Sequence, residues 1–307
     1  MPEDAVMAQF NSLFLAVSLI MGLLVGSFCN VCVGRWPHGE SVVSPRSRCP
    51  KCMNAIAWYD NIPLLSWLIL AAKCRHCKAP ISWQYPVVEA ITGVLFVLVY
   101  LRFDMTLATP IYMALAAAMV VVTFQDLADW TIPNEITLPG VPVGLGLSVI
   151  AMLVPAAGLR VIHPFDALAG IALGFGILYG LDRIAIFVLK KPGMGFGDVK
   201  LMAMLGAFIG WQGVLGTLML ASVLGSTIGL SMILYFKLKG APAAAETTPE
   251  AETDGGEPEK DDESDDGISL GAHYLPFGPY IAIAGLVYLF VGPEVIAWYL
   301  QQLAPVA

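Results

Sequence analysis

Long apolar runs alternate with short polar segments along most of this chain. Because an α-helix rises about 1.5 Å per residue, an apolar helix of roughly 17–25 residues can cross the hydrocarbon core of a bilayer. The pattern predicts eight such helices, of which 198–210 is short for a full crossing. We expect them near residues 10–33, 86–101, 108–125, 137–154, 166–189, 198–210, 213–236 and 276–300.

The composition supports this assignment. Of the 307 residues, 57% are hydrophobic and 13% are charged, whereas soluble domains carry about 25% charged residues. The mean hydropathy is +0.74. We therefore expect an all-α polytopic membrane protein that is surrounded by the lipid bilayer and has no nucleic acid as a partner.

The distribution of basic residues predicts the orientation. The N-terminus has no basic stretch before the first apolar run, and segment 34–80 then carries seven Lys or Arg residues against Glu40 and Asp60. Loops rich in Lys and Arg stay in the cytoplasm. The first helix is therefore expected to have its N-terminus outside, and alternation places 34–85, 126–136, 190–198 and 237–275 in the cytoplasm.

Two Cys-x-x-Cys pairs lie in the first basic loop. Cys49 and Cys52 are separated by 21 residues from Cys74 and Cys77, close to the spacing of zinc ribbons. Cytoplasmic thiols are reduced, and four of them close a tetrahedral zinc site. We expect a structural zinc ion in a small domain inserted after the first helix. Four unliganded thiols, or His76 in place of one Cys, are the alternatives.

A third pair, Cys29 and Cys32, lies at the end of the first apolar run. In such surroundings a cysteine usually serves as a small buried hydrophobic residue. We therefore expect these two side chains to pack in the core.

The net charge of -8 arises mainly from one segment. Between Glu246 and Asp266 there are eleven Asp or Glu residues and Lys260 as the only base. A stretch so poor in bulky apolar residues cannot bury enough surface to fold. We expect residues 240–267 to be a disordered cytoplasmic insertion.

Two carboxylates lie at the ends of apolar runs, where burial costs several kcal/mol unless the group has a partner or a function. Asp126 and Asp198 are separated by two predicted crossings and should lie on the same side. Two close carboxylates can divide the roles of general base and general acid. Gly195 and Gly197 would let the backbone approach an extended substrate. Asp129 competes with Asp126, and an N-cap is an equally good role for Asp198.

Several short motifs are spread along the chain. They are Gly26–Val31 with Arg35 and Pro37, Trp58–Trp67, Pro80–Ser82, Tyr85–Glu89, Asp126 with Ile132–Asn134, Gly195–Lys200 and Pro276–Pro279. These segments resemble those of the type IV prepilin peptidases, the bifunctional leader peptidases and N-methyltransferases of type IV pilus and type II secretion systems. The two aspartate motifs are shared with other GxGD-type proteases, and the cysteine domain narrows the resemblance to the bacterial bifunctional branch.

The resemblance implies an enzyme of the bacterial inner membrane that removes the basic leader of prepilins or pseudopilins at the cytoplasmic boundary. Asp126 and Asp198 would be its catalytic pair, and S-adenosylmethionine would then methylate the new N-terminus. No glycine-rich loop follows a strand, so a standard methyltransferase fold is not expected. The weak candidates for cofactor binding are Tyr59, Asp60, Asn61 and Glu89.

The expected organisation follows the charge and hydropathy pattern. It comprises a first helix (1–33), a zinc domain (34–85), a peptidase core (86–236), a loop (237–275) and a last helix with a tail (276–307). Two other functions agree with the residues alone. One is a peptidase without methylation, and the other is a zinc-stabilised membrane scaffold or transporter.

Overall fold

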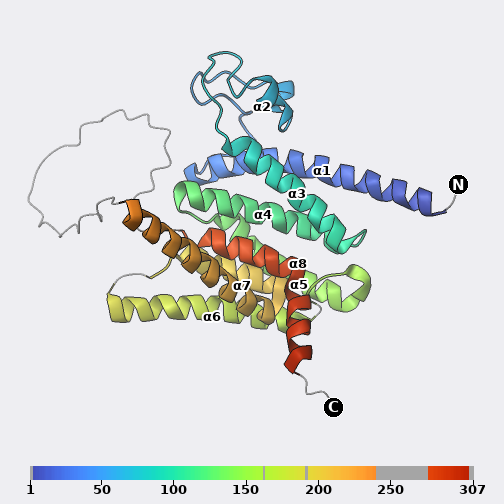
Figure 1. Ribbon diagram of the computed structural model, residues 1–307, viewed down its shortest axis with the longest axis vertical. Coiled ribbons are helices and arrows are strands. Elements are labelled where there is room, and N and C mark those ends of the chain that lie inside the picture. Colours follow the sequence, from blue (N-terminus) through green and yellow to red (C-terminus); the bar gives the residue numbers. More distant parts are fainter. Residues whose placement is uncertain (1–2, 162, 191–192, 240–275, 304–307) are drawn as a thin grey trace, which may run out of the picture.

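The computed structural model describes residues 3–161, 163–190, 193–239 and 276–303. The expected insertion at 240–267 lies outside these residues. Long helices dominate the described part, and short 3₁₀ helices connect some of them (Figure 1). The elements are α1 (Glu3–Arg35), η1 (Trp36–His38), η2 (Trp58–Asn61), α2 (Leu65–Ile69), α3 (Gln84–Phe103), α4 (Ala108–Asp129), α5 (Asn134–Leu153), η3 (Pro155–Ala157), α6 (Pro164–Leu189), α7 (Phe196–Lys239) and α8 (Gly278–Leu303).

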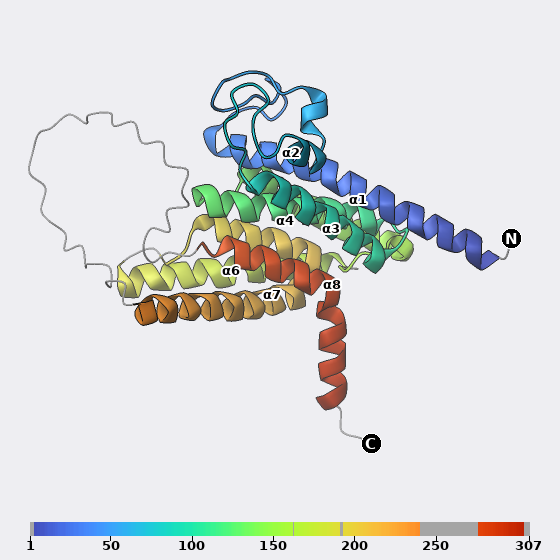
Figure 2. The ribbon, with the colours of Figure 1, turned by 45° about the horizontal axis from the view of Figure 1, so that its top comes forward.

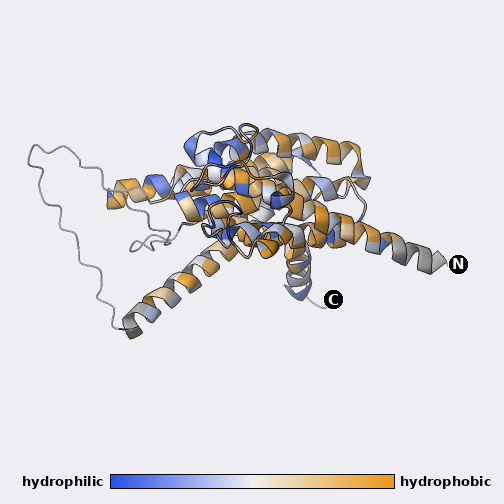
Figure 3. Cartoon of the chain, turned by 90° about the horizontal axis from the view of Figure 1, so that it is seen from above, coloured by the Kyte–Doolittle hydropathy of each residue, from blue (hydrophilic) through white to orange (hydrophobic). Residues whose placement is uncertain are grey.

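Seven helices of the described residues are long and apolar enough to cross a membrane, namely α1 and α3 to α8. Hydrophobic residues run along most of their length (Figure 3). The predicted class, an all-α polytopic membrane protein with a cysteine-containing domain after the first helix, is confirmed.

The predicted helices 198–210 and 213–236 form the single element α7. Its backbone breaks at Gly210, where φ is 71° and ψ is -179°. Residues with a side chain rarely adopt this conformation. The chain folds back there, so both ends of α7 lie on the same side of the bundle (Figures 1 and 2). Because two of the eight predicted helices are joined in α7, the described residues contain seven long apolar helices.

Helix α4 lies at the centre of the bundle and most of it is buried. It contacts α1, α3 and α8, while α7 packs against α5, α6 and α8. Helices α6 and α7 approach each other closely at Gly174. A Cβ atom at this position would lie only 2.6 Å from the carbonyl oxygen of Met202. Small residues permit such close helix packing without a hydrophobic driving force from water.

The cysteine domain, residues 39–83, lies against α1 and α3 (Figures 1 and 2). A buried carboxylate connects it to both helices. Glu89 on α3 accepts a 2.8 Å hydrogen bond from the backbone N–H of Leu64 and another from the Ser27 hydroxyl on α1. The domain is therefore fixed to the first two membrane helices.

Helix α8 bends at Pro293, and its last turns leave the bundle (Figures 1 and 2). Because proline has no N–H, the carbonyl of Leu289, four residues earlier, loses its helical partner. The guanidinium group of Arg160 replaces that partner, donating to the oxygen of Leu289 at 2.9 and 3.1 Å and to the oxygen of Phe290 at 3.2 Å.

Two further charges complete this arrangement. Arg102 at the end of α3 donates to the carbonyl of Phe290 at 2.8 Å. Glu294, next to the proline, forms ion pairs with both Arg102 and Arg160. The bend of α8 is thus held by side chains from two other parts of the chain.

We expect Arg160→Ala to destabilise the protein, because hydrogen bonds from a charged group contribute about 1.5–3 kcal/mol. Thermal unfolding in detergent measures the effect. In a Pro293→Ala background the restored N–H of residue 293 should satisfy the carbonyl of Leu289, so that Arg160→Ala costs less there. Equal losses in both backgrounds would show that Arg160 does not act on this carbonyl.

Candidate active site

Asp126 lies in the last turns of α4, and its side chain is buried, with 5% of its surface exposed. Its carbonyl accepts the N–H of Trp130, a residue in the left-handed conformation that ends the helix. Asp129, the other candidate from the sequence, lies one turn further on and is exposed. Of the two acids, Asp126 is therefore the one held inside the bundle.

Asp198 lies in the first turn of α7 and is 7% exposed. Its backbone N–H donates to the carbonyl of Gly195 at 3.1 Å. Its Oδ1 atom is buried and has no hydrogen-bond partner within the described part of the chain. A buried polar atom without a partner costs free energy and often marks a functional site.

The two aspartates lie at the same end of the bundle, close enough for their charges to interact. The backbone N–H of Gly278, at the start of α8, donates a hydrogen bond to the carboxylate of Asp126. The free N–H groups and the positive end of a helix dipole favour a carboxylate at this position. The pair therefore lies where three helices meet, at the end of α4 and the beginnings of α7 and α8.

Ile132, from the loop between α4 and α5, fills the space between the two aspartate-bearing segments. A Cβ atom at Gly197 would lie 2.9 Å from the Cβ of Ile132, and one at Gly278 would lie 3.0 Å from its Cδ1. The absence of a side chain at Gly197 thus permits close packing. The sequence had suggested that Gly197 contacts substrate, and this role stays a prediction.

Gly195 has different surroundings. It is exposed, and a Cβ atom there would lie 3.6 Å from Oδ2 of Asp198. Backbone beside the buried carboxylate is therefore accessible, as the predicted contact with an extended substrate requires.

Polar side chains hold the loops around Asp126 and Asp198. The ammonium group of Lys200 on α7 donates to the side-chain oxygen of Asn134 at the start of α5. Asp182 on α6 accepts the N–H of Gly193 at 3.2 Å and a hydrogen bond from Arg183 at 2.9 Å. The loop that leads into Asp198 is thereby tied to α6.

The structure also brings the four predicted metal ligands together. The sulfur atoms of Cys49, Cys52, Cys74 and Cys77 all lie within 4.8 Å of one another. The sulfurs of Cys49 and Cys77 are 3.8 Å apart. A tetrahedral ion with Zn–S bonds of about 2.3 Å requires sulfurs about 3.8 Å apart. The donor set therefore fits zinc, and His76 is not part of it.

The two cysteine pairs have the same backbone conformation. Cys49 N–H donates to the carbonyl of Asn54, and Cys74 N–H donates to that of Ala79. Isolated β-bridges close both turns, which contain a left-handed residue one position after the second cysteine. Each pair therefore presents two sulfurs in a preformed turn.

The remaining cysteines are in the core. Cys29 and Cys32 are 3% and 2% exposed, which confirms the prediction that they serve as buried hydrophobic residues. The Cys29 thiol lies 3.8 Å from the carbonyl of Ala117 on α4.

The four weak candidates for cofactor binding occupy different surroundings. The carboxylate of Asp60 accepts two hydrogen bonds from Arg75, at 2.7 and 2.5 Å, and this guanidinium lowers the pKa of Asp60. Arg75 also lies over the ring of Tyr59. Glu89 connects the cysteine domain to the helices, whereas Asn61 lines a cavity.

Several contacts at the site were not expected from the sequence. The Gly278 N–H was not identified as a partner of Asp126, although Pro279 marks a helix start with unpaired N–H groups nearby. The contact between Asn134 and Lys200 joins residues of two motifs to which no such role had been given. For Ile132 the sequence contains no signal beyond its place in a motif.

Comparison with known families identifies the chain. Residues 20–103 match the bacterial peptidase A24 N-terminal domain, and residues 113–230 match the type IV leader peptidase family. The two domains in this order define a bacterial membrane peptidase of the A24 class. No solved structure matches the chain.

Similar full-length proteins have the name prepilin leader peptidase/N-methyltransferase. The protein of Myxococcus xanthus is 34% identical, with 95% of each chain covered. That of Aeromonas hydrophila is 32% identical over 94% of this chain and 95% of its own, and that of Pseudomonas aeruginosa is 31% identical over 98% of each. The chain belongs to the type IV leader peptidase family, which confirms the resemblance found in the sequence.

Proposed function

We propose that this protein removes the leader peptide of type IV prepilins or pseudopilins and then methylates the new N-terminus. The observation that carries the peptidase half is the meeting of two buried aspartates at one end of the bundle, beside exposed backbone at Gly195. The names of the relatives support both halves. S-adenosylmethionine supplies the methyl group when it is bound.

In the proposed cleavage, Asp126 and Asp198 share one proton, as close carboxylates do. The ionised member takes a proton from a water molecule, which attacks the scissile carbonyl. The protonated member donates to the carbonyl oxygen. The C–N bond then breaks, and the new amine leaves with a proton returned by the pair. Exposed backbone at Gly195 can pair with an extended substrate next to these carboxylates.

The proposed orientation follows from charge and from the site. The basic loop with the cysteine domain lies at the cytoplasmic side of the bacterial inner membrane, and the N-terminus lies outside. A leader that ends in basic residues and precedes an apolar helix would then place its cleavage site at this boundary, where both aspartates lie.

We further propose that zinc in the cysteine domain is structural. Four cysteines leave no open coordination position for water or substrate. Cys49, Cys52, Cys74 and Cys77 would hold the ion, which would connect the two turns of a domain with few buried apolar residues. The zinc therefore takes no part in the peptidase chemistry.

Asp126→Asn and Asp198→Asn should each abolish cleavage of a prepilin in liposomes. An amide cannot exchange the proton that the reaction requires, and general acid–base catalysis typically contributes about 10²–10⁴-fold. Cleavage is followed by the shift in size on a gel. Asp129→Asn is the matched control and should cleave normally, because Asp129 is exposed. Full cleavage by either of the first two variants would contradict the proposed pair.

The purified protein should contain one zinc ion per chain. The double variant Cys49→Ser, Cys74→Ser should lose it, because one thiolate is then missing from each turn. Metal analysis by mass spectrometry measures the content. Cys29→Ala, which removes a thiol far from the cluster in sequence, should keep the ion. Absence of metal in the native protein would refute the zinc assignment.

Labelled S-adenosylmethionine should transfer its methyl group to a pilin that has already been cleaved. The Asp198→Asn variant should still transfer the label, because a pilin that is already cleaved no longer needs the peptidase pair. Scintillation counting of the recovered pilin measures the transfer. If the wild-type protein cleaves a prepilin but transfers no label, the protein is a peptidase alone.

A further inference from the structure

The short helix α2 of the cysteine domain exposes large apolar side chains. Leu65, Leu68 and Ile69 are 56%, 65% and 77% exposed. Because positions i, i+3 and i+4 lie on one side of a helix, these three side chains form a single apolar surface, which we call the α2 face. Continuous apolar surface outside the spanning helices is a mark of contact with a membrane or with another protein.

The polar groups of α2 are satisfied inside the domain. The Ser66 hydroxyl is buried and donates to the carbonyl of Tyr59 at 3.0 Å. The indole N–H of Trp67 donates to the carbonyl of Ile81 at 3.4 Å. On the surface of a water-soluble domain, the apolar side of a helix packs on the core and its polar side faces water. Helix α2 has the reverse arrangement.

Hydrogen bonds place the start of α2 beside the membrane helices rather than beyond their ends. Leu64, the residue before α2, donates its N–H to Glu89 on α3, which also accepts a hydrogen bond from Ser27 on α1. At 1.5 Å per residue, Ser27 lies about 12 Å from the end of α1 at Arg35. Glu89 lies about 8 Å from the start of α3 at Gln84.

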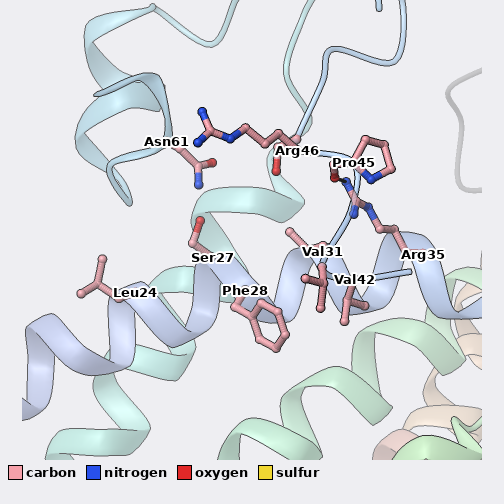
Figure 4. Close-up of a pocket in the computed structure, with 11 residues that line it drawn as sticks. Leu24, Ser27, Phe28, Val31, Arg35, Val42, Pro45, Arg46 and Asn61 are labelled. Atoms are coloured by element: carbon pink, nitrogen blue, oxygen red, sulfur yellow. Dashed lines mark hydrogen bonds between the residues drawn. The ribbon is translucent and has the colours of Figure 1, made fainter. Parts of the chain in front are cut away.

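The views of the fold show the same placement. Helix α2 and its domain lie along the flank of α1 and α3, not at the end of the bundle (Figures 1 and 2). Asn61, at the end of η2, and Ser27 of α1 line the same cavity of about 320 Å³ (Figure 4). The headgroup layer of a bilayer is about 5–8 Å thick on each side. Side chains at the level of Ser27 therefore reach the boundary between headgroups and hydrocarbon.

Two residues next to the α2 face are typical of a membrane interface. Trp83 directly precedes α3 and is 69% exposed, and the centroid of its ring lies 4.1 Å from that of Trp67 in α2. Tryptophan is enriched where hydrocarbon meets headgroups. Lys73 is exposed in the turn after α2. A lysine at this position can extend its ammonium group to anionic headgroups while its methylene groups lie against apolar surface.

We propose that the α2 face inserts into the leaflet at this end of the bundle, with Trp83 at its boundary and Lys73 paired to the headgroup of an anionic phospholipid. The inference requires only that the protein spans a membrane, and it does not depend on the proposed cleavage or methylation. The occupant is the bilayer itself, because α2 lies beside helices that lipid surrounds. A second copy of the chain, or the apolar helix of a substrate, would have to displace that lipid.

Photo-cross-linking from the α2 face of the full-length protein tests the proposal. The reactive residue p-benzoylphenylalanine is introduced at Leu68, and the protein is placed in nanodiscs of phosphatidylethanolamine and phosphatidylglycerol. Irradiation should add one phospholipid, which intact mass spectrometry detects. The same residue at Asn54, which is exposed in the first cysteine turn, is the matched control and should gain no lipid. The melting temperature establishes that both variants are folded.

The headgroup contact is tested with the same cross-linker at Leu68. The share of phosphatidylglycerol among the adducts should exceed its share in the nanodisc. Lys73→Gln should reduce this excess by up to about fivefold, because one basic residue near an anionic surface is lost. Lys78→Gln removes an exposed charge from the second cysteine turn and should leave the excess unchanged.

Four results would contradict the proposal. Absence of a lipid adduct at Leu68, or equal adducts at Leu68 and Asn54, would overturn the insertion of the α2 face. A cross-linked dimer in place of the lipid adduct would assign this face to contact between copies. A cross-link to added prepilin in place of lipid would assign it to substrate. An unchanged excess of phosphatidylglycerol in Lys73→Gln would overturn the headgroup contact.

Discussion

Burial of two carboxylates at one end of an apolar bundle is the constraint on which the rest of the structure depends. A single buried charge costs several kcal/mol, and a second one of the same sign adds to the cost. The fold offsets part of this cost for Asp126 by placing the N-terminus of α8 against it. Asp198 keeps one buried oxygen without a partner among the described residues. Contacts around Ile132 and Asn134 hold the segments that bring the two acids together.

The proposed peptidase residues and the cysteine domain come from different parts of the chain. The residues proposed for cleavage come from α4, α7 and the start of α8, whereas the cysteine domain lies against α1 and α3 (Figure 1). Glu89 and Arg35 attach that domain to the membrane helices. The domain is thus joined to the membrane helices by side-chain hydrogen bonds as well as by the chain itself.

Hydropathy predicted the helices because it is a local property summed over about twenty residues. Counting crossings then placed Asp126 and Asp198 at the same end, and cysteine spacing predicted the four-sulfur cluster. Contacts between distant segments left no such local signal. The carbonyl of Leu289 depends on Arg160, more than a hundred residues away, and only the folded chain shows this. The sequence favoured Asp126 over Asp129 only because Asp126 lies nearer the apolar run, and the folded chain shows that Asp126 is buried and Asp129 exposed.

The fold-back of α7 at Gly210 has a consequence for the partner of Asp126. A helix that crossed once would deliver the chain to the opposite face of the bundle, and α8 would then start far from both acids. Since α7 turns around, its end returns to the side on which it began, and the N-terminus of α8 starts there too (Figure 1). One backbone angle at a glycine near the far end of the bundle thus determines which face receives the N–H of Gly278.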